Sequence, residues 1–144
     1  MISEEQTISL SSAESGNTRW MSPEIIRPVD LKEGHPTKAS DCYSLGMVIY
    51  EILRGKAPFY QHTSYAVIMR ILEGERPLRP QQGRFTDGIW EILELCWEHK
   101  PADRISAKAV LRYLEGGSAL PDDLNGDAMM VDVGDQPENA SEED

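Results

Sequence analysis

The sequence predicts an all-α fold, and three observations lead to this prediction. Apolar residues recur at spacings of three and four in several stretches, as they do on one face of an α-helix. Typical helix-start residues precede these stretches, and Gly or Pro follows them. No stretch shows the clean alternation of a half-buried strand, and no internal repeat is present. The 144 residues suffice for one domain with a hydrophobic core.

The most apolar stretch is residues 40–54, which we predict to be a core helix that is buried nearly all round. Ser40 and Asp41 are suitable N-cap residues, and Gly55 ends the pattern before Pro58. At about 15 residues, this helix is too short for a bilayer and carries charges, so we predict no membrane span. One face is defined by a helical spacing of apolar residues: Leu45, Val48, Ile49, Ile52 and Leu53.

The remaining elements follow in chain order. Residues 1–15 are polar and lack a period, so we predict a flexible segment. Ser22 and Pro23 suit the N-cap and first position of a short helical turn. A third helix is predicted at about residues 64–72, where Tyr65, Ile68, Met69 and Leu72 share a face. A fourth helix should begin after Thr86 or Asp87 and a fifth after Ser106, the last ending at Gly116.

Charge divides the chain into two parts. Residues 1–114 carry 15 acidic and 14 basic residues, whereas residues 115–144 carry 10 acidic residues and no Lys or Arg. No basic stripe is present, so we expect no nucleic-acid partner. We predict a disordered acidic tail over residues 117–144. An apolar cluster within it, Met129, Met130, Val131 and Val133, is either a short docking motif or part of a plain solubilising tail.

Cysteine usage and the first residues bear on the cellular compartment. Cys42 and Cys96 each lie in an apolar helical run, which indicates buried free thiols and a reducing compartment. The N-terminal residues show neither a basic region nor a long apolar region, so no signal or transit peptide is recognised. These observations predict a cytoplasmic protein. His35, His62 and His99 show no metal-ligand spacing and are predicted to lie at the surface.

Four stretches, in this order, resemble the C-lobe of a protein kinase catalytic domain. GNTRWMSPE at residues 16–24 is similar to the end of an activation segment, and DCYSLGMVIYEILRGKAPF at residues 41–59 to the large central helix and its following turn. GERP at residues 74–77 and CWEHKPADRIS at residues 96–106 match two later family motifs. The Trp residues within these motifs resemble those of the tyrosine-kinase-like branch of Ser/Thr kinases. The resemblance implies a partial kinase domain over residues 16–116, preceded by an activation-loop-like segment.

The resemblance also implies roles for individual residues. Glu24 and Arg104 match a buried ion pair that ties the activation segment to the lower lobe; a buried Arg needs such a partner. Asp41 matches a helix residue that hydrogen-bonds the catalytic loop, and it would also serve as a cap. Trp97 matches a structural core residue. The loop that receives the substrate residue after the phosphoacceptor is matched by Gly16, Asn17, Arg19, Trp20 and Met21.

The motifs that carry phosphoryl transfer are not found in this sequence. It contains no GxGxxG, no VAIK-like strand, no His-Arg-Asp and no Asp-Phe-Gly. We therefore assign no catalytic, cofactor-binding or metal-binding residue, although ATP and Mg²⁺ are implied for the full-length family. Asn17 stands where the family has Thr, which puts the activity of even a full-length relative in doubt.

Two functional hypotheses follow from these motifs. In the first, the chain is part of a longer kinase that transfers the γ-phosphate of ATP to Ser or Thr of protein substrates. Ser and Thr residues in the segment 1–15, or Thr18, would then be candidate phosphosites. In the second, the short chain is a catalytically inactive relic that binds proteins through its helices and acidic tail, with exposed apolar surface as a possible interface. The sequence does not predict an oligomeric state.

Overall fold

The computed structural model describes residues 17–30 and 34–117. The predictions for residues 1–15 and for the tail beyond Gly117 lie outside these ranges. The described residues form helices without any strand, which confirms the predicted all-α class. In chain order the elements are η1 (Thr18–Trp20), α2 (Pro23–Ile26), α3 (Lys38–Arg54), α4 (Ser64–Leu72), α5 (Asp87–Cys96), η2 (Pro101–Asp103) and α6 (Ala107–Leu114).

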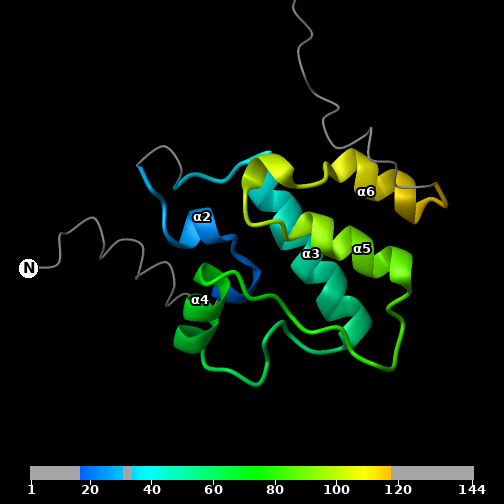
Figure 1. The fold of residues 1–144 in the computed structure, drawn as a ribbon, viewed down its shortest axis with the longest axis horizontal. Helices are drawn as coiled ribbons and strands as arrows, with labels where there is room; N and C mark the ends of the chain where they lie inside the picture. Colours follow the sequence, from blue (N-terminus) through cyan, green and yellow to red (C-terminus); the bar gives the residue numbers. More distant parts are fainter. Residues whose placement is uncertain (1–16, 31–33, 118–144) are drawn as a thin grey trace, which may run out of the picture.

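Helix α3 runs through the centre of the described fold (Figure 1). Helices α5 and α6 lie to one side of it in this view, and α2 and α4 lie to the other. The short N-terminal element η1 contacts both α3 and α4. Segments from both ends of the described chain therefore meet around one central helix, an arrangement that buries a single core cluster.

Helix α3 begins two residues earlier than predicted. Its N-cap is Thr37, whose hydroxyl accepts a hydrogen bond from the Ser40 N–H at 3.1 Å. The Ser40 hydroxyl accepts in turn from the Thr37 N–H at 2.8 Å, which completes a capping box. The prediction of Ser40 or Asp41 as the cap was wrong because the Thr37 side chain accepts the hydrogen bond from the free N–H group of the first turn. Asp41 lies in the first turn and is exposed.

The buried face of α3 also differs from the predicted one. Tyr43 and Met47 are fully buried, and Gly46 and Tyr50 accompany them on the face toward the core. On the predicted face, Leu45, Ile49 and Leu53 are half-buried and pack against the core cluster, whereas Val48 is 40% exposed and Ile52 is 69% exposed. The helix is therefore not buried all round among the described residues. The spacing of apolar side chains correctly predicted a helix, but it did not identify the face that packs against α5.

The other helices follow the predictions closely in extent. Helix α4 covers the predicted residues, and α5 and α6 follow Thr86 and Ser106, whose hydroxyls accept hydrogen bonds from the N–H groups of Ile89 and Ala109. The face of α4 was predicted less well. Val67 and Ile71 are fully buried, whereas Tyr65 is 70% exposed.

Both cysteines are buried free thiols, as predicted. Burial raises the pKa of the Cys96 thiol to about 12, so this side chain behaves as a core residue and not as a reactive thiolate. His35 and His99 are exposed, and His62 is half-buried. Within residues 17–30 and 34–117, no helix is long and apolar enough to cross a bilayer.

Candidate functional site

The segment from η1 to α2 is fixed to the helical body by a buried ion pair. Arg104 Nη1 donates to Glu24 Oε1 at 2.7 Å, and Nη2 donates to Glu24 Oε2 at 2.8 Å. The Arg104 side chain is fully buried, and that of Glu24 is only 15% exposed. The bidentate geometry is the strongest form of Arg–carboxylate contact. The structure thus brings together the two residues that the sequence paired across 80 positions.

The surroundings of Arg104 satisfy its remaining donors. Its guanidinium donates to the carbonyl oxygens of Ala39 at 3.1 Å, Glu98 at 2.8 Å and His99 at 3.2 Å. Partial burial by itself would raise the pKa of the Glu24 carboxyl, but the hydrogen bonds and positive charge of Arg104 outweigh it and lower that pKa below its ordinary value. Glu24 is therefore ionised in the folded protein at neutral pH.

Arg104 and a second arginine, Arg76, both approach the aromatic ring of Tyr43. Arg76 belongs to the connector, residues 73–86, which joins α4 to α5. Arg104 Cζ and Arg76 Cζ each lie 5.1 Å from the centroid of the Tyr43 ring. Arg76 Nε also donates to the Trp97 carbonyl oxygen at 2.8 Å, which joins the connector to the end of α5. From the sequence, Arg76 was recognised only as part of the GERP motif, and no role was predicted for Tyr43. The sequence offered only their positions: Tyr43 lies within the apolar stretch 40–54, and Arg76 lies between two predicted helices.

Arg19 attaches η1 to the turn that follows α3. Its guanidinium donates to three carbonyl oxygens of this turn: Pro58 at 3.0 Å, Phe59 at 2.6 Å and His62 at 2.7 Å. Phe59 has a φ of 53°, a left-handed conformation that is uncommon for a residue other than glycine. The three hydrogen bonds from Arg19 help to hold this turn in shape. Arg19 therefore acts as a link between two loops in the described structure.

Trp20 and Thr18 complete the attachment of η1. Trp20 Nε1 donates to Glu51 Oε2 at 3.0 Å, and the Ser44 hydroxyl donates to the Trp20 carbonyl oxygen at 2.7 Å. Both partners lie on α3. The Thr18 side chain is fully buried, so the suggestion that Thr18 is a phosphosite is incompatible with this conformation. A kinase would need to displace η1 to reach that hydroxyl.

The other predicted site residues occupy different environments. Asn17 is exposed at the start of η1, and Met21 is half-buried against the core cluster. Gly16 lies outside the described residues. Asp41 is exposed and does not cap α3, which corrects its predicted second role. What these residues do toward a substrate stays a prediction.

Trp97 lies in the core at the end of α5, where it packs edge-on against Tyr50 and Trp90. The sequence analysis missed Gly46, which lets α3 approach this Trp closely. A Cβ at Gly46 would lie 2.6 Å from Trp97 Nε1 and 2.7 Å from Cys96 Cβ, so no larger residue fits without displacement. A glycine in the middle of an apolar helix was the only available signal for this close crossing.

The described residues do not fit the magnesium nucleotide that the family implies. Among residues 17–30 and 34–117, no group of three or more His, Cys, Asp or Glu side chains is placed to hold a metal ion. The charged side chains of Glu24, Arg104 and Arg19 are engaged with one another and with backbone carbonyls. We assign no chemical step to these residues.

Comparison with known proteins identifies the class to which this geometry belongs. Residues 1–114 match the family "Protein tyrosine and serine/threonine kinase". The chain therefore belongs to the protein kinase family, which confirms the resemblance found in the four motifs.

Individual relatives are similar over most of this chain. It is 32% identical over 105 residues to mitogen-activated protein kinase kinase kinase 12 of Rattus norvegicus, covering 73% of this chain and 11% of that protein. It is 31% identical over 104 residues to serine/threonine-protein kinase VIK of Arabidopsis thaliana, covering 72% of this chain and 22% of that protein. The chain spans a minor part of the length of the curated relatives that it matches.

Proposed function

We propose that this chain forms the substrate-side helical part of a kinase that transfers the γ-phosphate of ATP to Ser or Thr of proteins. The observation that carries the proposal is the buried contact between Glu24 and Arg104. It fixes residues 17–26, which include the loop that resembles the substrate loop of kinases, to Arg104 after η2, while η1 contacts α3 and α4. Similarity to relatives named as serine/threonine-protein kinases supports the choice of phosphoacceptor.

In this proposal, the described residues position a peptide and do not perform the chemistry. The bonds from Arg19 to the turn after α3 and from Trp20 to Glu51 hold the loop in one conformation before a substrate arrives. Such preorganisation lowers the entropy that a peptide loses when it is oriented. The ATP site and the catalytic loop would be supplied by parts of a longer polypeptide.

The test begins with the native polypeptide. An antibody to the acidic tail is used to precipitate the protein from cell extract, and an immunoblot gives its size. The precipitate is incubated with Mg²⁺, ATP labelled on the γ-phosphate and a protein substrate mixture, followed by phosphoamino-acid analysis. We expect a band well above 16.2 kDa and labelled phosphoserine or phosphothreonine. Labelling of tyrosine alone, or no labelling by a large polypeptide, would contradict the proposal.

One observation favours a second candidate, an inactive protein-binding module. Val48 and Ile52 expose apolar surface on one face of α3, and such surfaces commonly mark interaction sites. If the native band lies at 16.2 kDa and shows no labelling, this function becomes the better one. A partner that co-precipitates with the native chain, but not with an Ile52→Lys variant, would support it.

A further inference from the structure

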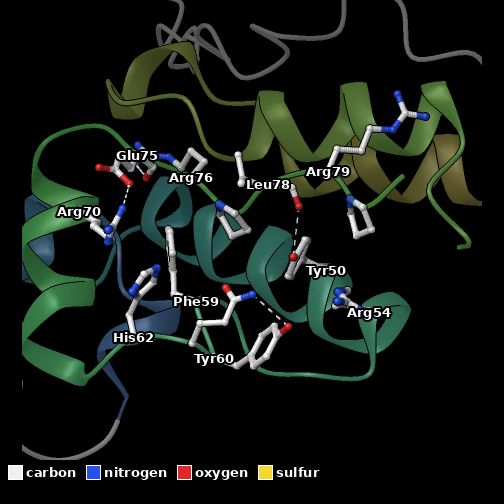
Figure 2. Close-up of a pocket in the computed structure, with 13 residues that line it drawn as sticks. Tyr50, Arg54, Phe59, Tyr60, His62, Arg70, Glu75, Arg76, Leu78 and Arg79 are labelled. Atoms are coloured by element: carbon white, nitrogen blue, oxygen red, sulfur yellow. Dashed lines mark hydrogen bonds and ion pairs between the residues drawn. The ribbon is translucent and has the colours of Figure 1, made fainter. Parts of the chain in front are cut away.

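A cleft of about 490 Å³ opens between the end of α3, the turn after it and the connector that leads to α5 (Figure 2). Its exposed apolar lining comes from Tyr60 and Leu78, which are 39% and 87% exposed, while the lining residues Tyr50 and Phe59 are buried. Four arginines line it as well, and Glu75 is the one carboxylate in the lining. The arginines are Arg54, Arg70, Arg76 and Arg79. The cleft therefore combines an apolar wall with a strongly positive rim.

The rim already binds carboxylates of the domain itself. Arg70 pairs with Glu75, and Arg79 Nη2 donates to Asp87 Oδ1 at 2.7 Å. The two arginine side chains remain 38% and 37% exposed, so each is partly accessible to solvent. Lys56 adds a further positive charge 4.5 Å from the centroid of the Tyr60 ring. The rim thus has the chemistry to accept further carboxylates.

The same chain contains a segment of complementary chemistry. Residues 127–135, with the sequence DAMMVDVGD, combine three Asp residues with four large apolar residues. This is the apolar cluster for which the sequence left open a docking role. Its Met and Val side chains suit the apolar wall, and its carboxylates suit the arginine rim. Residues 115–144 contain no Lys or Arg that would oppose this attraction.

The last turn of α6, from which the tail continues, lies beside the start of α5, and the start of α5 contacts the cleft rim. Tyr113, in the last turn of α6, packs against Gly88 so closely that a Cβ on Gly88 would overlap the Tyr113 hydroxyl. The neighbouring residue Asp87 holds Arg79 of the cleft rim. From Gly117 to Asp127 the chain has ten further residues, which span up to about 35 Å when extended. The segment therefore has ample length to reach the cleft.

We propose that residues 127–135 bind in this cleft of their own chain, with the apolar side chains against Tyr60 and Leu78 and the aspartates at the arginine rim. This contact would cover a surface next to the turn that Arg19 holds, since the Phe59 and His62 carbonyls that accept from Arg19 belong to lining residues. The contact depends on the charge and shape of the cleft and the segment, and it does not require kinase activity.

A paramagnetic label placed beside the segment tests the proposal in the full chain. Gln136→Cys is labelled with a nitroxide, while Cys42 and Cys96 are buried with raised pKa values and react slowly. We expect the amide NMR signals of Tyr60 and Leu78 to lose most of their intensity at low salt. Raising the ionic strength to about 1 M shortens the Debye length to about 3 Å and should restore much of it.

Two pairs of matched variants separate the specific contact from general charge attraction. Arg54→Glu/Arg79→Glu should restore the signals, whereas Arg27→Glu/Lys108→Glu, with the same change of charge at exposed positions outside the cleft, should not. On the tail, Asp127→Asn/Asp132→Asn/Asp135→Asn should restore them with the folded part unaltered. Glu142→Gln/Glu143→Gln/Asp144→Asn removes the same charge outside the segment and should leave the broadening in place.

Three results would overturn the proposal. The first is unchanged intensity of Tyr60 and Leu78 in the labelled chain. The second is broadening that persists in the tail variant within residues 127–135. The third is broadening that appears only between labelled chains and separate ¹⁵N-enriched chains in a mixture, because the tail would then bind a second copy.

Discussion

The two faces of α3 differ in composition and in surroundings. The face toward α5 carries Tyr43, Gly46 and Met47, all buried. Two guanidinium groups lie over the Tyr43 ring, and Trp97 lies close to Gly46. The opposite face carries Val48 and Ile52, which are 40% and 69% exposed. The exposed face is the more regularly apolar in sequence, yet the buried face contains the glycine, the tyrosine and the polar contacts.

This difference shows what determines burial in a central helix. A helix whose side chains are mainly apolar on all sides has no unique buried face, so its neighbours decide which side is covered. Here, Gly46 permits a close approach of α5, and Arg104 and Arg76 pack over Tyr43.

Arg104→Ala should lower the free energy of unfolding by about 3–5 kcal/mol, because it leaves Glu24 partly buried without its cation. Urea denaturation of the full chain measures the change. Arg70→Ala is the matched control, since it removes one partner of an exposed ion pair and should cost only about 0–1 kcal/mol. Equal losses in the two variants would show that burial does not distinguish these pairs.

Met47→Ala should lower the free energy of unfolding by about 2–5 kcal/mol, because the deleted side chain is fully buried and leaves a cavity. The midpoint of urea denaturation at constant slope reports the loss. A loss below that of Ile52→Ala would reverse the assignment of the two faces.

Gly46→Ala should destabilise the fold by about 1–3 kcal/mol although alanine favours helices, because the added methyl group has no space beside Trp97 and Cys96. Gly→Ala at an open helix position would instead stabilise by about 1 kcal/mol. Thermal unfolding followed by circular dichroism gives the sign. An increase in the melting temperature would mean that α5 moves away at little cost.

The ion pair also predicts a pH dependence. The pKa of Glu24 is lowered in the fold, so its contribution to stability is fully present above its ordinary pKa of 4.5 and is lost as the pH falls through the lower folded-state value. Urea denaturation at a series of pH values should show a smaller decline in acid for Glu24→Gln than for the unmodified chain. Identical slopes would remove this carboxylate as a cause of acid sensitivity.

Ile52→Ala should change the free energy of unfolding by no more than about 0.5 kcal/mol, because the side chain is mostly exposed. The measurement is again urea denaturation, alongside Met47→Ala. A loss near that of Met47→Ala would mean that the exposed face of α3 is covered in solution, and light scattering would then show whether a second copy covers it.

Much of the local structure followed from the sequence. The bounds of α4 and the caps Thr86 and Ser106 depend on neighbouring residues, and these signals lie within a few positions. The pairing of Glu24 with Arg104 was predicted only through family resemblance, because no local rule joins residues so far apart. The clamp by Arg19 was not predicted, since its acceptors are backbone carbonyls, which every residue possesses.

From the sequence we could predict the all-α class, the extent of most helices, the family and the segregation of negative charge into the tail. Each of these depends on residue type, order or short-range spacing. The tertiary structure alone decided which face of α3 is buried, that Thr18 is inaccessible, and that four arginines meet at one cleft. These properties depend on which distant segments pack together, and a periodic apolar pattern fits more than one such packing.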